Sequence, residues 1–230
     1  MDVVYPYKRP DDEFELRYSL RSLVNVPHGR VIIGGDKPRI TSCKVVWAGA
    51  APHADRFRSS GKNIWQALSQ CDVSGDFIAM NDDFFVLRPW SGHRAHRGSI
   101  EDYLASGSPT GGYRAMVERT RDILASFGIV APLFYGLHVP FVYNAERLCT
   151  VLRELHGQSY SLRTVYGNLF PEACGQRDDV KVTEWNGAPP ADDLLSSSDG
   201  CARDSKFRDW LRGKFPTPSQ YEAGAEREAA

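Results

Sequence analysis

FIAMNDDFFV, residues 77–86, is the most informative stretch of this sequence. Its beginning, Phe77 to Met80, is the apolar run expected of a buried central strand. That run leads directly into Asn81, Asp82 and Asp83, which places polar oxygens at the carboxyl end of the strand. Ligands of open α/β sheets bind at such ends. The segment therefore predicts a sheet with a binding site at its edge.

Outward from this strand, apolar runs alternate with helical patterns in the order expected of a β-α-β fold. The expected strands are residues 2–7, 30–35, 44–47, 77–80 and 180–185. The expected helices begin near residue 12 and at Ser60, and others cover 99–104, 113–127, 145–156 and 161–170. We predict an α/β fold with a mixed, mostly parallel central sheet flanked by helices, Rossmann-like in arrangement. Residues 1–215 would form one domain, with loops across much of the carboxyl third, and 216–230 a C-terminal tail.

The composition is that of an ordinary globular protein. Of the 230 residues, 42% are hydrophobic and 25% are charged, and the formal net charge is -1. This balance gives no global basic field, so binding of a nucleic acid would need a local patch. The five cysteines never form a CxxC pair, which argues against a disulfide framework or a zinc site. With neither a signal segment nor an apolar run of membrane-spanning length, we expect a cytoplasmic protein without a membrane span.

The pair Asp82-Asp83 has two interpretations. At a strand-to-turn junction both carboxylates can converge on one Mg²⁺ or Mn²⁺ ion, because these cations prefer oxygen ligands. A cation at this place would neutralise the charge that develops on a departing nucleoside diphosphate. Alternatively, the pair only forms a turn, as most Asp pairs in loops do.

Four segments, in order, resemble the conserved regions of the Stealth-type sugar-phosphate transferases. They are DVVYPY at 2–7, ELRYSLRSL at 15–23, MNDDFFV at 80–86 and LHVPF at 137–141. The chain is also similar to short glycosyltransferases encoded by actinobacterial phages, which SSSDG at 196–200 and FPTPSQYE at 215–222 resemble as well. The resemblance implies a GT-A-like nucleotide-sugar fold, a divalent cation, and transfer of a sugar or sugar phosphate. For a phage-encoded protein, the expected location is the host cytoplasm.

The same resemblance assigns roles to individual residues. It makes Asp83 the metal-binding carboxylate, with Asp82 beside it, and it places Asp2 near the donor on the first strand. His138 matches the active-site histidine of the family and is a candidate to complete the metal shell. Arg163 matches an arginine that follows this histidine and is a candidate donor-binding residue.

Where the larger family has an acidic residue, on the helix before the NDD strand, this sequence has Lys62, Asn63 and Gln66. Lys62 lies in the first turn of that expected helix, an end that favours anions, so we count Lys62 and Asn63 as donor-binding candidates. Alternatively, Lys62 only solvates the helix start. Two lone carboxylates, Asp199 and Glu184, are candidates for a general base that deprotonates the acceptor hydroxyl.

Two further groups of residues are candidates for donor binding. Arg17 and Arg21 stand one helical turn apart and could clamp phosphate oxygens, or they could form a solvated helix face. Tyr5, Pro6 and Tyr7 end the first strand, where an aromatic ring can stack on a nucleobase. A place in the core or on the surface is the alternative for the two tyrosines.

These observations predict a metal-dependent glycosyltransferase that moves a sugar from a nucleotide-sugar donor to an acceptor hydroxyl. The acceptor could be a glycan, a protein or a hydroxylated DNA base, and Mn²⁺ or Mg²⁺ is the expected cofactor. A sugar-phosphate transferase of Stealth type is the nearest alternative, and it would release a nucleoside monophosphate instead of a diphosphate. A non-catalytic module that binds a nucleotide or a glycan is a further alternative.

Overall fold

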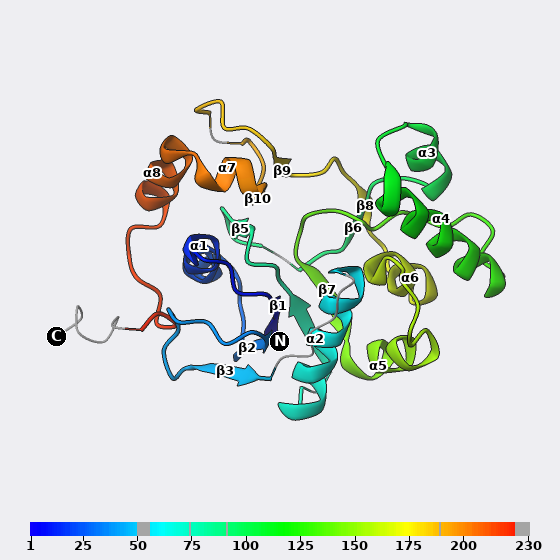
Figure 1. Ribbon diagram of the computed structural model, residues 1–230, viewed down its shortest axis with the longest axis horizontal. Coiled ribbons are helices and arrows are strands. Elements are labelled where there is room, and N and C mark those ends of the chain that lie inside the picture. Colours follow the sequence, from blue (N-terminus) through cyan, green and yellow to red (C-terminus); the bar gives the residue numbers. More distant parts are fainter. Residues whose placement is uncertain (50–55, 74, 91, 189, 224–230) are drawn as a thin grey trace.

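A five-stranded sheet forms the centre of the computed structural model, which describes residues 1–49, 56–73, 75–90, 92–188 and 190–223 (Figure 1). The strand order is β3, β2, β1, β4, β7. Their bounds are β1 Asp2–Tyr7, β2 Val31–Gly35, β3 Val45–Ala48, β4 Asp76–Ala79 and β7 Phe141–Asn144. The first four strands are parallel to one another, and β7 pairs antiparallel with β4. The predicted mixed, mostly parallel sheet flanked by helices is therefore confirmed.

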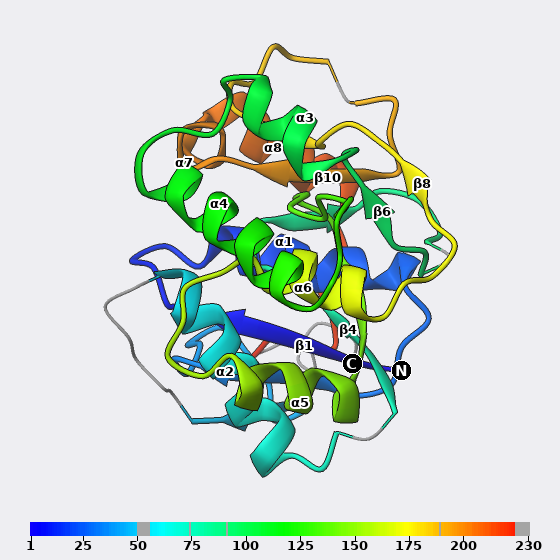
Figure 2. The same cartoon turned by 90° about the vertical axis from the view of Figure 1, so that its right-hand side faces the viewer.

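Helices cover both faces of this sheet. Their bounds are α1 Phe14–Ser22, η1 Leu23–Asn25, α2 Arg56–Gln70, α3 Ile100–Ala105, α4 Gly111–Ser126, α5 Ala145–Glu154, α6 Leu162–Leu169, α7 Asp199–Arg203 and α8 Ser205–Lys214. Side chains alternate along β1, so Tyr5 packs on the α1 side while Val4 packs on the side of α2 and α5. Figure 2 shows α1 on one side of β1, and α2 with α5 on the other. Helix α2 lies so close to β2 that a β-carbon on Gly34 would collide with the carbonyl oxygen of Asn63.

A second, smaller sheet lies on the far side of α1 from the central sheet (Figure 1). Its strands are β5 Phe84–Val86, β10 Leu194–Ser197 and β9 Lys181–Val182, with β10 in the middle. Phe85 of β5 packs with Phe14 of α1 and with Phe207 of α8 in one apolar cluster. The sequence predicted loops across much of this carboxyl third, and β10, α7 and α8 correct that prediction. Their apolar residues are short runs whose partners lie far away in the sequence.

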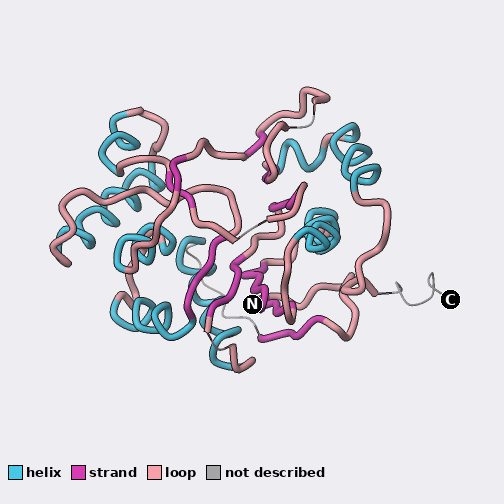
Figure 3. Tube along the Cα trace, turned by 180° about the vertical axis from the view of Figure 1, so that it is seen from behind, coloured by secondary structure: helices cyan, strands magenta, loops and turns pink. Residues whose placement is uncertain are grey.

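Helices α3, α4 and α6 gather beyond the β7 edge of the central sheet (Figure 3). Helices α3 and α4 share an apolar cluster with Phe134, whose ring stacks on Tyr103 with the centroids 4.2 Å apart, whereas the apolar residues of α6 pack with the central sheet. A two-stranded parallel sheet, β6 (Ala95–His96) with β8 (Gly175–Gln176), adjoins this group. Within the described residues, no helix is both long enough and apolar enough to cross a membrane.

Two helices begin at other residues than the sequence predicted. Helix α2 begins at Arg56, upstream of the expected cap Ser60. Helix α1 begins at Phe14, and the N–H of Phe14 donates to the side chain of Asp12 at 3.1 Å. Asp12 therefore satisfies a backbone donor from just outside the helix, whose N-cap residue is Glu13.

The predicted C-terminal tail from residue 216 begins as a packed segment. Glu222 forms a β-bridge with Thr41 and is only 2% exposed. Its carboxylate accepts from Arg17 at 2.7 Å and from Arg21 at 2.7 Å, which holds the segment against α1. The remainder of the predicted tail, 224–230, lies outside the described residues.

Candidate functional site

The order of the central strands creates a crevice between β1 and β4. The chain passes from β1 to β2 to β3 on one side of β1, and then crosses to place β4 on the other side. In open α/β sheets, ligands bind at the carboxyl ends of the strands where the order reverses in this way. Lys8 and Arg9 follow β1 at this point, and Asp82 and Asp83 follow β4.

Asp82 and Asp83 occupy the two central positions of a turn between β4 and β5. The N–H of Phe84 donates to the carbonyl oxygen of Asn81 at 3.2 Å and closes the turn. The Ser19 hydroxyl of α1 donates to the same oxygen at 3.3 Å. The predicted turn is therefore confirmed, and it brings both carboxyl groups to one cavity.

This cavity has a volume of about 380 Å³, within the usual range of small-molecule sites, about 300–1,000 Å³. Its lining comes from the segment after β1, the start of α1, the NDD turn, the end of β10 and the start of α7. The lining residues are Lys8, Arg9, Pro10, Glu15, Asp82, Asp83, Ser197 and Asp199. Four carboxyl groups and two cations therefore meet at one end of the sheet.

Asp83 is fixed by the second sheet. Its Oδ2 accepts from the Ser196 hydroxyl at 2.9 Å and from the Lys181 ammonium at 3.1 Å. Its carbonyl oxygen accepts from the Ser197 N–H at 3.1 Å. These bonds leave Oδ1 of Asp83 as the oxygen with room for a ligand among the described contacts.

Negative charge is crowded in the cavity. Burial, and then the charges of Asp83 and Glu15, raise the pKa of Asp82 to about 7. Burial also raises the pKa of Glu15 to about 7, with Asp83 and Asp199 adding to the shift and a hydrogen bond from Ser197 opposing it. Both shifts mean that burial, and then the neighbouring carboxylates, disfavour the ionised forms of Asp82 and Glu15. The cavity is therefore suited to a ligand or an ion that brings positive charge.

A divalent cation fits the oxygens that the turn presents. Asp82 and Asp83 offer the carboxylate ligands that Mg²⁺ and Mn²⁺ prefer. Mg²⁺ commonly takes one or two carboxylates from the protein and completes its shell with waters and substrate phosphates. Among the described residues, no three His, Cys, Asp or Glu side chains gather as a metal site, so the predicted shell of Asp82, Asp83 and His138 is not assembled.

His138 instead pairs with Asp179, a residue that the sequence did not single out. Nδ1 of His138 lies 2.7 Å from Oδ2 of Asp179, and the His138 N–H donates to Oδ1 at 2.9 Å. Burial alone would raise the pKa of Asp179, but the hydrogen bonds and charge of His138 hold that pKa below its usual range. An ionised carboxylate only accepts, so Nδ1 of His138 carries a proton toward Asp179, and this bond sets the direction of Nε2.

Arg163 supports the His138 segment, in place of the predicted contact with a donor. Its Nη1 donates to the carbonyl oxygens of Leu137 and Val139, each at 2.6 Å, on either side of His138. Its guanidinium lies over the Phe84 ring, 5.2 Å from the centroid. Arg163 thus links the His138 segment to the strand that follows the NDD turn.

The aromatic residues of β1 are part of the core. Tyr5 and Tyr7 are 0% and 1% exposed, so neither ring is available to stack on a nucleobase. The Tyr5 hydroxyl lies 3.0 Å from the Ser19 hydroxyl, and the Tyr7 hydroxyl donates to Glu13 at 3.0 Å. Pro6 lies between them within the β1–β2 ladder. The structure corrects the predicted stacking role, because period-two alternation turns both tyrosines toward α1.

Three predicted donor contacts lie apart from the cavity. Asp2 stands at the amino end of β1, the opposite end of the sheet from Asp82, and forms an ion pair with Arg30 at 2.6 Å. Arg17 and Arg21 bind the buried Glu222 carboxylate. None of the three belongs to the described lining of the cavity.

The remaining candidates divide between the cavity and other places. Asp199 lines the cavity, whereas Glu184 is an exposed residue after β9 and does not belong to the described lining. Asn63 is buried, and its side-chain amide donates to the carbonyl oxygen of Tyr7 at 3.3 Å, so it supports the end of β1. Lys62 lines a different cavity, between α2 and α5.

Sequence reasoning missed several cavity residues. Lys8 and Arg9 had a usable signal, because they directly follow the first expected strand and parallel strands end at the same edge of a sheet. Glu15 and Ser197 had none, since their meeting depends on a strand that returns from the carboxyl third. The same holds for Lys181, whose partner Asp83 lies 98 residues earlier.

A scan of the chain against protein-family models gives no match, and a search of the curated proteins gives none either. The resemblance to Stealth-type and phage transferases therefore stays a prediction from short segments. The arrangement of the cavity and the chemistry of its residues carry the functional argument.

Proposed function

We propose that this chain is a metal-dependent glycosyltransferase that moves a sugar from a nucleotide-sugar donor to an acceptor hydroxyl on a glycan, a protein or a hydroxylated DNA base. The observation that carries the proposal is the Asp82-Asp83 turn at the strand-order reversal, with the pKa of Asp82 raised to about 7. A pair of adjacent carboxylates that lines one cavity with the cations Lys8 and Arg9 suits a metal-bound diphosphate. The parallel sheet is compatible with the GT-A-like fold that we propose with it.

In this proposal the donor diphosphate lies between the two sides of the crevice. Lys8 and Arg9 would bind its oxygens from the β1 side, and Asp82 and Asp83 would hold Mg²⁺ or Mn²⁺ on the β4 side. The cation would stabilise the charge that develops on the leaving diphosphate. Lys181 and Ser196 keep Asp83 in one orientation, which preserves the ligand geometry between turnovers.

The acceptor hydroxyl must lose a proton, and Glu15 is the residue that the geometry favours as the base. It lines the cavity, and a pKa of about 7 matches a base that works near neutral pH. The Ser197 hydroxyl donates to Glu15 and fixes the direction of its carboxyl group. Asp199, also in the lining, is the alternative base and retains that part of the sequence prediction.

Sugar-phosphate transfer is a second candidate, favoured by the His138–Asp179 pair. An imidazole whose Nδ1 is held by a carboxylate has its Nε2 oriented for proton transfer. In that reaction the acceptor oxygen attacks phosphorus and the nucleoside monophosphate leaves. The two candidates therefore release different nucleotides.

The test is product analysis with a panel of nucleotide sugars. The full chain is incubated with each donor and Mn²⁺ or Mg²⁺, and the released nucleotide is separated by liquid chromatography. We expect metal-dependent release of a nucleoside diphosphate that falls at least a hundredfold in Asp83→Asn. Asp209→Asn is the matched control, because this exposed aspartate lies on α8, where its contact is a surface ion pair with Arg212.

Each outcome separates the alternatives. Release of a monophosphate would favour the sugar-phosphate transferase. A nucleotide that raises the melting temperature equally with and without metal, and whose sugar donor is not cleaved, would indicate a binding module. Full turnover in Asp83→Asn would remove the proposed role of the carboxylate pair.

A further inference from the structure

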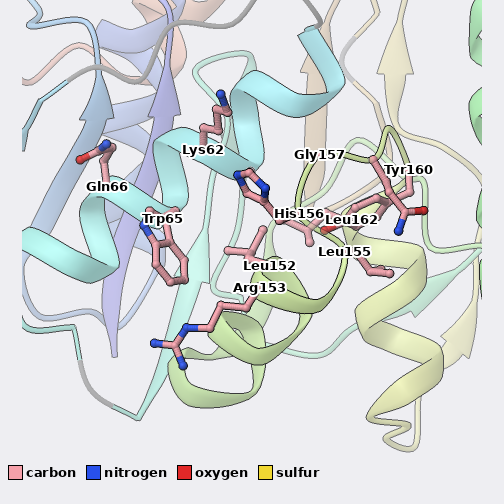
Figure 4. A pocket seen from close by; sticks show the side chains of 12 residues that line it. Lys62, Trp65, Gln66, Leu152, Arg153, Leu155, His156, Gly157, Tyr160 and Leu162 are labelled. Carbon is pink, nitrogen blue, oxygen red and sulfur yellow. The ribbon is translucent and has the colours of Figure 1, made fainter.

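A second cavity, of about 430 Å³, lies between α2 and the segment that runs from α5 into α6 (Figure 4). The described linings of this cavity and of the Asp82 cavity have no residue in common. Lys62, which the sequence placed at the donor, belongs to this second cavity. Nothing in the proposed transfer reaction uses it.

The walls of the cavity are mostly apolar. Leu152, Leu155 and Leu162 come from α5 and the segment after it, and the rings of Trp65 and Tyr160 complete the apolar surface. Figure 4 shows Trp65 and Leu152 on facing elements around the same space. Small-molecule sites have this character, with an apolar lining and a few placed polar groups, and the volume lies in their range.

The charged groups of the described lining are all cationic. They are Lys62 of α2, Arg153 of α5 and His156 just after α5, which is cationic when protonated. Within the described part of the chain, none of the three has an ion pair with a carboxylate. The Arg153 guanidinium carbon lies 5.4 Å from the centroid of the Trp65 ring, a cation–π contact on one side of the cavity. A concave apolar wall with cations of one sign concentrates anions.

We propose that this cavity binds an amphipathic organic anion. A carboxylate or phosphate group would lie against Lys62 and His156, since Figure 4 shows the Arg153 guanidinium beyond the Trp65 ring, on the other side from Lys62. The apolar body of the ligand would pack on the leucines and on Trp65. The apolar part of the ligand can be an aliphatic chain or an aromatic ring. The site does not depend on the proposed transfer reaction.

Isothermal titration of the full chain with matched small probes tests this proposal. Octyl phosphate and 1-naphthyl phosphate represent the aliphatic and the aromatic source, and 1-octanol, 1-naphthol and inorganic phosphate are the counterparts that lack one half of the ligand. Lys62→Gln removes a cation, and His156→Leu removes the imidazole N–H donors. Lys206→Gln removes an exposed cation on α8, outside both described linings, and Asp83→Asn alters the other cavity. Melting temperatures confirm that each variant is folded.

We expect one of the two amphipathic phosphates to bind with 1:1 stoichiometry, at least tenfold more tightly than its uncharged counterpart and than inorganic phosphate. Lys62→Gln and His156→Leu should each weaken binding by roughly tenfold, which corresponds to about 1.4 kcal/mol. Lys206→Gln and Asp83→Asn should leave the affinity for the phosphate probes unchanged. The probe that binds more tightly shows whether the apolar part of the natural ligand is aliphatic or aromatic. The proposal is overturned if neither phosphate binds, if charged and uncharged probes bind equally, or if the two cavity variants bind like the wild type.

Discussion

Replacing Asp82 with Asn measures how much burial and the neighbouring carboxylates together disfavour an ionised Asp82. The pKa of Asp82 is about 7 in the folded protein against an ordinary value of 3.8, so the folded state holds this proton more tightly than the unfolded chain does. The stability that depends on this group is therefore greatest below pH 3.8, and it is lost as the pH rises toward 7. Asn has a similar shape and does not ionise. Asp82→Asn should consequently be more stable than the wild type above pH 7.

The size of the effect follows from the shift. About 3 pKa units at 1.36 kcal/mol each give a ceiling of about 4 kcal/mol. Asp82 is only partly buried by its exposed area, so water screens part of the repulsion and we expect roughly 1–3 kcal/mol at pH 8. The advantage of the variant should shrink as the pH falls from 7 toward 4, because Asp82 of the folded wild type then becomes neutral.

Urea denaturation in EDTA at pH 5, 6, 7 and 8 gives the required free energies of unfolding. Asp209→Asn, an exposed aspartate on α8, is the control and should change stability little at any of these pH values. The reasoning is refuted if Asp82→Asn is no more stable than the wild type at pH 8, or if its advantage is the same at pH 5. Adding Mn²⁺ or Mg²⁺ should narrow the gap, because only the wild type retains both carboxylates.

Three further variants test other parts of the structure. Glu222→Ala should destabilise the protein by about 3 kcal/mol in urea denaturation, since it leaves two arginines of α1 without their buried carboxylate, and an unchanged midpoint would contradict this packing. Arg163→Met should lower the free energy of unfolding by about 2 kcal/mol, because two carbonyl oxygens beside His138 lose their donor; a neutral effect would mean that water replaces it. For sugar-phosphate transfer, the candidate that uses the His138–Asp179 pair, Asp179→Asn should reduce turnover at least tenfold, and wild-type turnover would show that orientation of His138 is unimportant.

The sequence was sufficient for the central sheet because its signals are local. Phe77 to Met80 is an apolar run that needs both faces covered, and the alternation of strands and helices before it predicts a parallel arrangement. The turn at Asp82-Asp83 was equally readable. The antiparallel strand β7 was not predicted, because nothing in its few residues specifies the direction in which it meets β4.

The candidate site was predictable only in part, because its other residues depend on distant partners. Arg17 and Arg21 have the spacing of a phosphate clamp, but a carboxylate about 200 residues later takes both. Tyr5 lies near the end of the first expected strand, where a ring could stack on a nucleobase, yet α1 covers it. Glu15 stands on a helix with no local sign of a site, and its neighbours arrive from the NDD turn and from β10. Contacts between residues so far apart in the sequence cannot be predicted from the spacing of residues within one segment.

The bond between Ser196 and Asp83 spans 113 residues, and this has a consequence for synthesis of the protein. During translation the first strands and the NDD turn leave the ribosome long before β10 exists. A nascent chain that ends before residue 199 has the carboxylates of Asp82 and Asp83 but lacks the wall that completes the cavity around them. The protein should therefore gain the ability to bind a ligand in this cavity late and in a single step, when the last quarter of the chain has emerged from the ribosome and packed against the rest.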